Sequence, residues 1–269
     1  MEENQFRIPS HLDPPGCLEE YLINPNNPRE TIQLAAFHEH RFAFYYWIKW
    51  TDEMAGVIPS LVSFDWHQDL VRPYDDQMDA LQGLDTENSG DVAFYTWAKL
   101  SHFNDEQVYS AVMLNKIKDV YVICRQLSKR EKSITVNDFE GNPHQIFIFH
   151  SVEAFQAYLP QITDQKIYFD IDLDYFTLGN PTSMGNPNKH KEYTYLKTSE
   201  IKAAFSYRNP VIKFILDRIA GFTIAMEPHF CGGLKKSNEL FHLIEDIFFT
   251  DALFCKDLNR RGPKWRHRI

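Results

Sequence analysis

The chain has few cysteines, and the four that it has are far apart in the sequence. They are Cys17, Cys124, Cys231 and Cys255. No two form a C-x-x-C pair, which excludes a zinc knuckle, argues against a disulfide framework and favours a reducing cytoplasmic setting. No apolar run approaches the roughly 20 residues that span a bilayer, and the first residues lack the regions of a signal peptide. We therefore expect a cytoplasmic protein without a membrane partner.

Positive charge is also scarce, with 28 Lys and Arg against 37 Asp and Glu and a formal net charge of -9. This balance argues against a nucleic-acid partner, because phosphate contacts need a basic surface. It is compatible with a cationic substrate. The exception is the basic C-terminal tail, residues 256–269, which is either a solvated segment or a docking site for an acidic peptide or subunit. Its basic side chains include Arg260, Arg261, Lys264, Arg266 and Arg268.

The pattern of apolar runs predicts one α/β domain over residues 1–269, after an irregular segment at residues 1–30 that is rich in Pro and Asn. Strand candidates lie at 31–37, 57–64, 119–124, 145–149, 166–169 and 221–226. Helix candidates lie at 41–50, 106–117, 151–159, 209–220 and 237–254. Their alternation indicates βαβ units and a mostly parallel sheet. Residues 75–91 are expected to form an acidic surface excursion, and a hairpin or a sheet edge is expected around residues 140–143.

Side chains that commonly bind metal ions gather in four short clusters. The clusters are His40; Asp65, His67 and Asp69; Asp170 and Asp172; and Glu227. The last three follow apolar runs, and ligands of α/β proteins bind at the carboxyl ends of such strands. In extended backbone, residues i, i+2 and i+4 share a face, so Asp65, His67 and Asp69 are expected to converge.

Oxygen and imidazole donors without a thiolate favour Mn²⁺, with Fe²⁺, Co²⁺ and Zn²⁺ as alternatives. One such motif alone can be a solvated strand end with a capping Asp. Several buried acids without a counter-charge are costly, however, and two divalent ions would supply that charge. Two ions can also activate a water molecule for hydrolysis.

The motifs carry a resemblance to a known family. Asp65-Trp66-His67-Gln68-Asp69 is similar to the ureohydrolase motif Asp-Ala-His-x-Asp, and Phe169-Asp170-Ile171-Asp172 resembles Ser-Phe-Asp-x-Asp. Glu39-His40 resembles Gly-Gly-Asp-His without its glycines, and Ala225-Met226-Glu227-Pro228 resembles the late strand whose Glu receives the guanidinium. From about residue 31 to 255 the order of motifs resembles the arginase and deacetylase superfamily. The chain looks most similar to a divergent branch that includes peptide arginases.

This resemblance implies a three-layer arginase-like fold and two Mn²⁺ ions, with Asp65 and Asp170 bridging them. One ion would be held by His40, Asp65, Asp69 and Asp170, and the other by Asp65, His67, Asp170 and Asp172. Asp69 would also accept a hydrogen bond from the hydroxide between the ions, and Glu227 would bind the guanidinium. Asp174 would lie outside the ligand set.

The segment that carries the proton-shuttle His of free-arginine arginases is not recognisable after Asp69. His102 and His229 are candidates for that role, although a lone His is more often structural. The segment that binds the free α-amino and α-carboxylate groups is missing too, which fits an arginine within a peptide.

The resemblance therefore implies conversion of arginine side chains in a ribosomally made precursor peptide to ornithine, with release of urea. One alternative is a hydrolase of a small free guanidine or amide, as in agmatinases and deacetylases. Another is a metal-containing binding protein without turnover. A homo-oligomer is compatible with the sequence.

Overall fold

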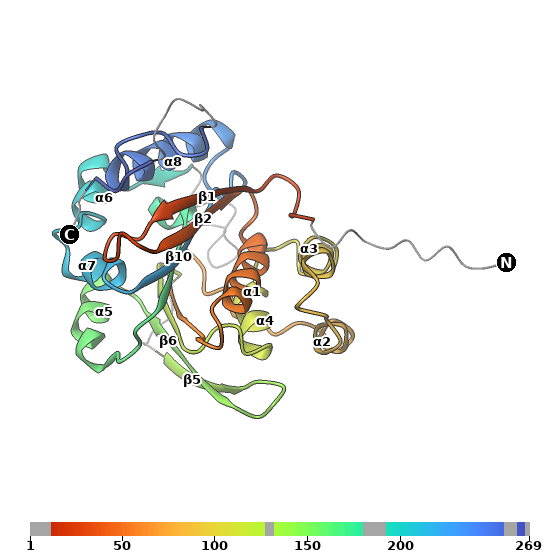
Figure 1. Ribbon diagram of the computed structural model, residues 1–269. Helices are drawn as coiled ribbons and strands as arrows, with labels where there is room; N and C mark the ends of the chain where they lie inside the picture. The colour runs from red at the N-terminus through yellow and green to blue at the C-terminus, as the bar shows by residue number, and fades with distance from the viewer. Residues whose placement is uncertain (1–11, 127–131, 180–191, 256–262, 267–269) are drawn as a thin grey trace.

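An eight-stranded, mostly parallel sheet forms the centre of the computed structural model (Figure 1). The structure describes residues 12–126, 132–179, 192–255 and 263–266. The strand order is β1-β2-β10-β7-β3-β4-β6-β5, and β1 and β5 at the two edges run antiparallel to their neighbours. The parallel strands between them are β2 (Thr31–Phe37), β10 (Ile219–Ala225), β7 (Ile167–Asp172), β3 (Ser60–Asp65), β4 (Val120–Cys124) and β6 (Pro143–Phe149).

Helices cover both faces of this sheet (Figure 1). On one face lie α1 (Ala43–Glu53), α3 (Ser89–Ala98) and α4 (Gln107–Met113), with one buried hydrophobic cluster between them and the strands. On the other face lie α5 (Val152–Tyr158), α6 (Thr198–Ala204), α7 (Pro210–Leu216) and α8 (Leu234–Phe248), with a second cluster. The predicted three-layer α/β fold is therefore confirmed.

Local sequence signals explain several of these helices. The Ser151 hydroxyl accepts a bond from the Ala154 amide at 3.1 Å and caps α5. Asn209 caps α7 in the same way, and Pro210 occupies the first turn, where its missing N–H costs nothing. Gly221 in β10 is required by packing, because a Cβ there would lie 2.5 Å from the Trp50 ring of α1.

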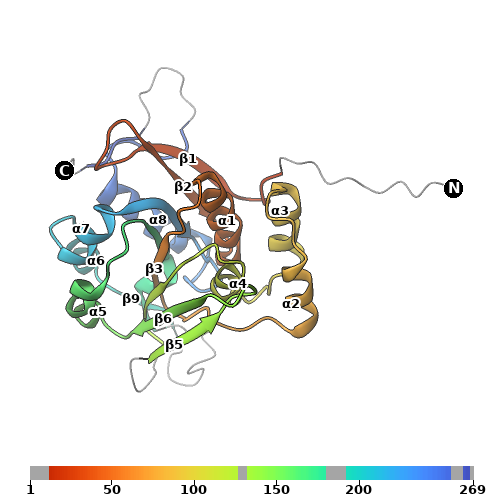
Figure 2. The ribbon, with the colours of Figure 1, turned by 60° about the horizontal axis from the view of Figure 1, so that its bottom comes forward.

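Two segments differ from the predictions. The first 30 residues are not irregular throughout, because β1 (Leu18–Ile23) pairs with β2 along its whole length. Of its residues only Leu22 is buried, so the strand lacks the apolar alternation that would reveal it. The acidic excursion contains α2 (Asp75–Gln82) and the start of α3, which lie outermost on the α1 side (Figure 2). Met78 and Leu81 form the buried face of α2.

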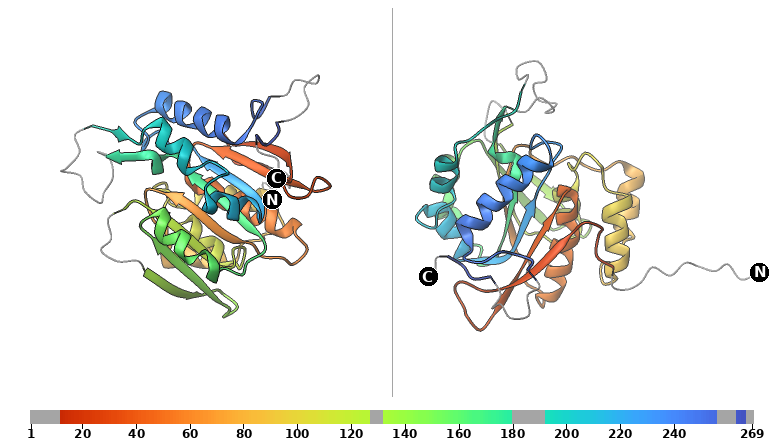
Figure 3. Two further views of the ribbon diagram at one scale, coloured as in Figure 1. Left: turned by 90° about the vertical axis from the view of Figure 1, so that its left-hand side faces the viewer. Right: turned by 90° about the horizontal axis from the view of Figure 1, so that it is seen from above.

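The predicted hairpin is confirmed, with β5 (Lys132–Asn137) and β6 forming one edge of the sheet opposite β1 and β2 (Figure 3). A separate two-stranded sheet joins β8 (Thr177–Gly179) to β9 (Thr194–Tyr195). The short 3-10 helices are η1 (His40–Phe42), η2 (Leu159–Gln161) and η3 (Leu173–Phe176).

The C-terminal tail is described only at residues 263–266. There the Trp265 indole donates to the Ile23 carbonyl at 2.8 Å and Arg266 donates to the Phe249 carbonyl, so this piece packs against the body of the domain. The predictions for Arg260, Arg261 and Arg268 lie outside the described residues. None of the described helices has the length and apolarity needed to cross a membrane.

Candidate metal centre

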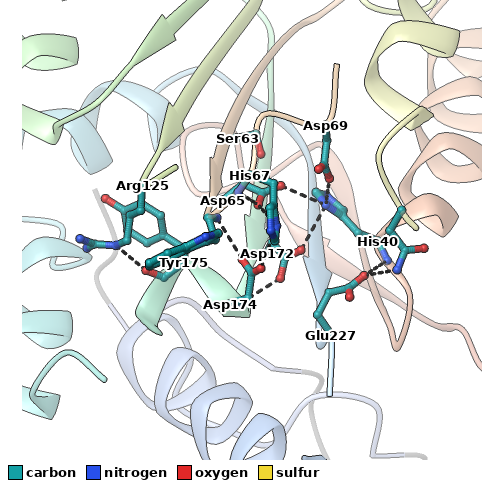
Figure 4. Close-up of polar contacts among 12 residues, drawn as sticks. His40, Ser63, Asp65, His67, Asp69, Arg125, Asp172, Asp174, Tyr175 and Glu227 are labelled. Atoms are coloured by element: carbon teal, nitrogen blue, oxygen red, sulfur yellow. Dashed lines mark hydrogen bonds and ion pairs between the residues drawn. The ribbon is translucent and has the colours of Figure 1, made fainter. Parts of the chain in front are cut away.

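The carboxyl ends of neighbouring parallel strands bring the predicted clusters together (Figure 4). His40 opens η1 after β2, Asp65 ends β3, Asp172 ends β7, and Glu227 follows β10. All four side chains are buried. Because these strands are adjacent and point the same way, residues far apart in the sequence meet at one edge of the sheet.

One nitrogen of the His40 imidazole, Nδ1, faces three carboxylates. This nitrogen lies 2.8 Å from Asp69 Oδ2 and 3.3 Å from both Asp65 Oδ2 and Asp172 Oδ2. Nδ1 is buried and makes a hydrogen bond with none of them. A buried nitrogen that lies among acceptor oxygens and makes no hydrogen bond to them has the arrangement expected of a metal ligand.

Asp170 has a different position from the one predicted. Its Oδ1 accepts a bond from Thr223 at 2.6 Å, and its Oδ2 accepts one from Ser63 at 2.7 Å and lies 3.0 Å from His40 Nε2. With Nε2 donating to this carboxylate, the lone pair of His40 is on Nδ1. Carboxylates that orient a metal-binding His in this way are common behind metal sites. The contacts of Asp170 therefore favour a supporting role and do not match the predicted bridge.

A second group forms around His67. Its Nδ1 lies 3.2 Å from Asp174 Oδ2 and 3.8 Å from Asp65 Oδ1. Asp174 Oδ1 accepts the Trp66 amide at 3.0 Å, whereas its Oδ2 is buried without a hydrogen bond. Asp172 connects the two groups, since its Oδ2 faces His40 and its Oδ1 accepts the Asp174 amide at 3.0 Å. Asp174, expected to lie outside the ligand set, is thus among the side chains that could hold a metal ion.

Asp69 and Glu227 both have left-handed backbone, with φ of 51° and 39°. This conformation is uncommon outside glycine. Asp69 Oδ2 accepts a bond from Gln107 Nε2 at 2.5 Å. Glu227 Oε1 accepts one from the His40 amide and one from Asn104 Nδ2, both at 2.6 Å. Gln107 and Asn104 are site residues that sequence reasoning missed, because an isolated amide side chain belongs to no metal-binding motif.

Six buried carboxylates lie in or beside this centre, and no Lys or Arg in the described ranges forms an ion pair with any of them. They are Asp65, Asp69, Asp170, Asp172, Asp174 and Glu227. Burial raises the pKa of Asp69 and of Glu227 to about 8. Burial also raises the pKa of Asp172 and of Asp174 above the ordinary range. The centre is therefore short of positive charge.

The two imidazoles supply part of that charge. Burial alone would lower the pKa of His67, but Asp174 and Asp65 outweigh it and raise the pKa to about 10. The pKa of His40 is also raised, because Asp170 and the other carboxylates outweigh burial. Both histidines thus attract protons, since no Lys or Arg in the described part of the chain pairs with these carboxylates.

Two sets of side chains can hold a metal ion. The ligand atoms of His40, Asp65 and Asp69 lie within 4.8 Å of one another, and so do those of Asp65, His67 and Asp174. Asp65 belongs to both sets. Carboxylate oxygens and imidazole nitrogens without a thiolate suit hard or borderline divalent ions.

A cavity of about 730 Å³ leads to His67 and Asp69. Its described lining is His67, Gln68, Asp69, Leu70, Val71, Phe103, Asp105, Gln126, His229 and Phe230, with no Lys or Arg among them. Of the two proton-shuttle candidates, His229 is part of this lining. His102 is not, and its exposed ring packs on Phe103 with centroids 4.1 Å apart.

A scan of protein-family models found no match to this chain, and a search of curated proteins found none either.

Proposed function

We propose that this protein is a binuclear metal-dependent hydrolase that converts arginine side chains of a precursor peptide to ornithine and urea. The observation that carries the proposal is the position of Asp65, which belongs to both ligand sets through its two oxygens. Its Oδ2 faces His40 and its Oδ1 faces His67. A carboxylate shared in this way is what a pair of closely spaced divalent ions needs.

The contacts favour a ligand set that differs from the one predicted. One Mn²⁺ would be held by His40, Asp65, Asp69 and Asp172, and the other by Asp65, His67, Asp172 and Asp174. Asp170 would hold the His40 ring from behind. Four ligand carboxylates balance the charge of two divalent ions, so binding would remove the excess of negative charge around them.

When bound, the ions would supply the positive charge that activates a water and polarises the reacting group. Asp69 lies beside His40 and also lines the cavity, so it is placed to accept the proton of that water. Glu227 is held by two donors on Oε1, and in the described structure Oε2 accepts no hydrogen bond. That free oxygen can pair with a guanidinium N–H.

The reaction is then balanced. Water adds its oxygen to the guanidinium carbon, the bond from that carbon to the side-chain nitrogen breaks, and this nitrogen takes up a proton. The products are the amine of ornithine and urea.

The cavity supports a substrate larger than free arginine. Its volume of about 730 Å³ lies in the range of sites that enclose drug-sized ligands. Leu70, Val71, Phe103 and Phe230 give it apolar walls, and its described lining offers no cation for a free α-carboxylate. An arginine within a peptide has no α-carboxylate and fits these walls.

The test is urea release by the Mn²⁺-loaded protein from arginine-containing peptides, agmatine and free arginine, together with the mass of each peptide. Urea from a peptide, with each reacted arginine reduced to the mass of ornithine, supports the proposal. Turnover confined to agmatine would assign the small-guanidine alternative. Two bound ions without urea from any of these compounds would instead support a binding protein.

A further inference from the structure

We propose that Asn104 positions Glu227 and, through its own amide oxygen, contacts the guanidinium group of the substrate. This inference rests on the proposed function and concerns how the same site recognises its cation. Asn104 lies between α3 and α4 in the sequence, and its neighbours Phe103 and Asp105 both line the cavity. Asn104 itself is not among the described lining residues, so it is buried between two residues of the cavity wall and contacts Glu227.

Two donors hold the Glu227 carboxylate through the same oxygen. Asn104 Nδ2 and the His40 amide both donate to Glu227 Oε1 at 2.6 Å. Two donors on one oxygen fix the plane of the carboxylate and leave Oε2 as its open acceptor. A carboxylate anchored through one oxygen can direct the other at a cation without losing side-chain freedom on binding.

The amide oxygen of Asn104 is open to a further contact. Oδ1 is buried and has no hydrogen-bond partner in the described structure, and the whole residue is only 7% exposed. A buried acceptor without a partner is costly, and few occur in native proteins. A guanidinium carries N–H donors along several edges, so it can satisfy this oxygen and Glu227 Oε2 together.

An amide side chain at this position is neutral, which matters in a centre rich in carboxylates. The centre already contains six buried carboxylates. An amide adds an acceptor for the cation and a donor for Glu227 without adding another negative charge. Asp at this position would lose the donor and place a carboxylate beside Glu227 Oε1, which raises the energy of both.

Backbone conformation alone also favours Asn at this position, because Asn104 has φ of 57°. Asn115, after the other end of α4, has φ of 54° and no contact with the site carboxylates. Asn104→Gly and Asn115→Gly therefore form a matched pair. Glycine adopts this conformation without strain, so each variant removes only the amide side chain.

The experiment measures steady-state kinetics of both variants on a reactive arginine peptide. It also measures the affinity of each for that peptide and for the same peptide with citrulline, whose side chain is neutral. Loss of a hydrogen bond to a charged group should raise KM of Asn104→Gly by about 10- to 100-fold, with a smaller change in kcat. Its preference for arginine over citrulline should fall by a similar factor. Asn115→Gly should match the wild type in both.

An unchanged KM and an unchanged arginine preference in Asn104→Gly would overturn the inference, and a lower melting temperature alone would show that the residue is structural. The binding comparison separates this inference from the proposed function. A wild type that prefers arginine peptide to citrulline peptide but releases no urea would refute the hydrolase, and Asn104→Gly would still test the cation contact. A wild type without any preference would refute the contact.

Discussion

Two buried clusters of His and carboxylate lie within the described residues, one in the β5–β6 hairpin and one at the candidate metal centre. In the hairpin, His144 Nδ1 lies 2.5 Å from the Lys118 carbonyl oxygen and Nε2 lies 3.3 Å from Asp138 Oδ2. Asp138 also accepts bonds from the amides of Glu140 and Asn142 and from the Asn142 side chain. Each polar atom of the His144–Asp138 pair has a partner within the chain.

At the metal centre the opposite holds, because His40 Nδ1 and Asp174 Oδ2 are buried without hydrogen bonds. The two environments shift carboxyl pKa values in opposite directions. Hydrogen bonds from Asn142, His144 and Glu140 outweigh burial and lower the pKa of Asp138, whereas burial raises the pKa of Asp69 to about 8. The hairpin cluster is complete as a structural element. The buried carboxylates of the candidate metal centre have no Lys or Arg partner in the described part of the chain, which supports a metal site there.

Of the changes that test the difference between the two clusters, Asp172→Asn should have the largest effect on activity and metal content. The substitution removes the carboxylate that faces His40 and connects it to the second group. Loss of a ligand that supports several kcal/mol of transition-state stabilisation should lower urea release by about a thousandfold or more. The bound metal, measured by atomic absorption, should fall below that of the wild type. Asp138→Asn is the control and should retain both. Full activity with unchanged metal content in Asp172→Asn would refute the proposed ligand set.

The pH dependence of the metal-free protein gives the next largest effect. Folded Asp69 and Glu227 keep their protons up to about pH 8, whereas in the unfolded chain they titrate at their ordinary values of 3.8 and 4.5. Between these limits the folded state binds more protons, so their contribution to stability is full below about pH 4 and is lost as the pH rises towards 8. We expect the free energy of unfolding to fall by a few kcal/mol over this range.

In the hairpin, the contribution of Asp138 to stability depends on pH in the opposite direction. The lowered pKa of Asp138 gives a contribution that is present above its ordinary pKa and is lost only as the pH falls through its folded pKa. Bound Mn²⁺ should reduce the loss of stability with rising pH at the candidate metal centre, because ligand carboxylates are deprotonated in the complex. Urea denaturation at pH 5 and pH 8, with Mn²⁺ or with a chelator, measures both effects. Greater stability of the chelated protein at pH 8 than at pH 5 would contradict the argument.

Metal binding itself should give a smaller but direct stabilisation. At a free Mn²⁺ concentration 100-fold above the dissociation constant, each site adds about 2.7 kcal/mol to the free energy of unfolding. For a domain of this size that corresponds to a rise in melting temperature of roughly 5–10 °C. Thermal unfolding with and without Mn²⁺ measures the shift. Asp138→Asn should show the full rise and Asp172→Asn little of it; equal shifts in the two variants would place the bound metal elsewhere.

Much of the fold followed from the sequence because apolar runs of strand length mark the buried parallel strands. The predicted strand at residues 31–37 coincides with β2. The edge strand β1 was not predicted, because it is held by pairing with β2, and the local sequence pattern does not indicate that pairing. The charged helix α2 was missed as a helix because only Met78 and Leu81 form its buried face.

The site was predicted as a gathering of clusters, but not in its detailed assignment. Asp170, Asp172 and Asp174 alternate along the chain, so in extended backbone all three share a face. The strand β7 ends at Asp172 and η3 begins at Leu173, and this turn directs Asp174 towards His67. The point at which β7 ends therefore decides that Asp172 lies beside His40 Nδ1 and Asp174 beside His67. The sequence spacing does not contain that information.

The smallest expected effect comes from Asp138→Asn in the hairpin. The substitution replaces an acceptor-only carboxylate with an amide, so one of the bonds from Asn142, Glu140 or His144 loses its acceptor. Loss of a buried partner costs about 1–3 kcal/mol, which a denaturant titration resolves. Because the cluster is complete within the chain, added Mn²⁺ should restore none of this loss, whatever the metal does at the sheet end. Selective rescue of Asp138→Asn by Mn²⁺, beyond the wild-type shift, would mean that the hairpin also binds metal and that the two clusters differ only in degree.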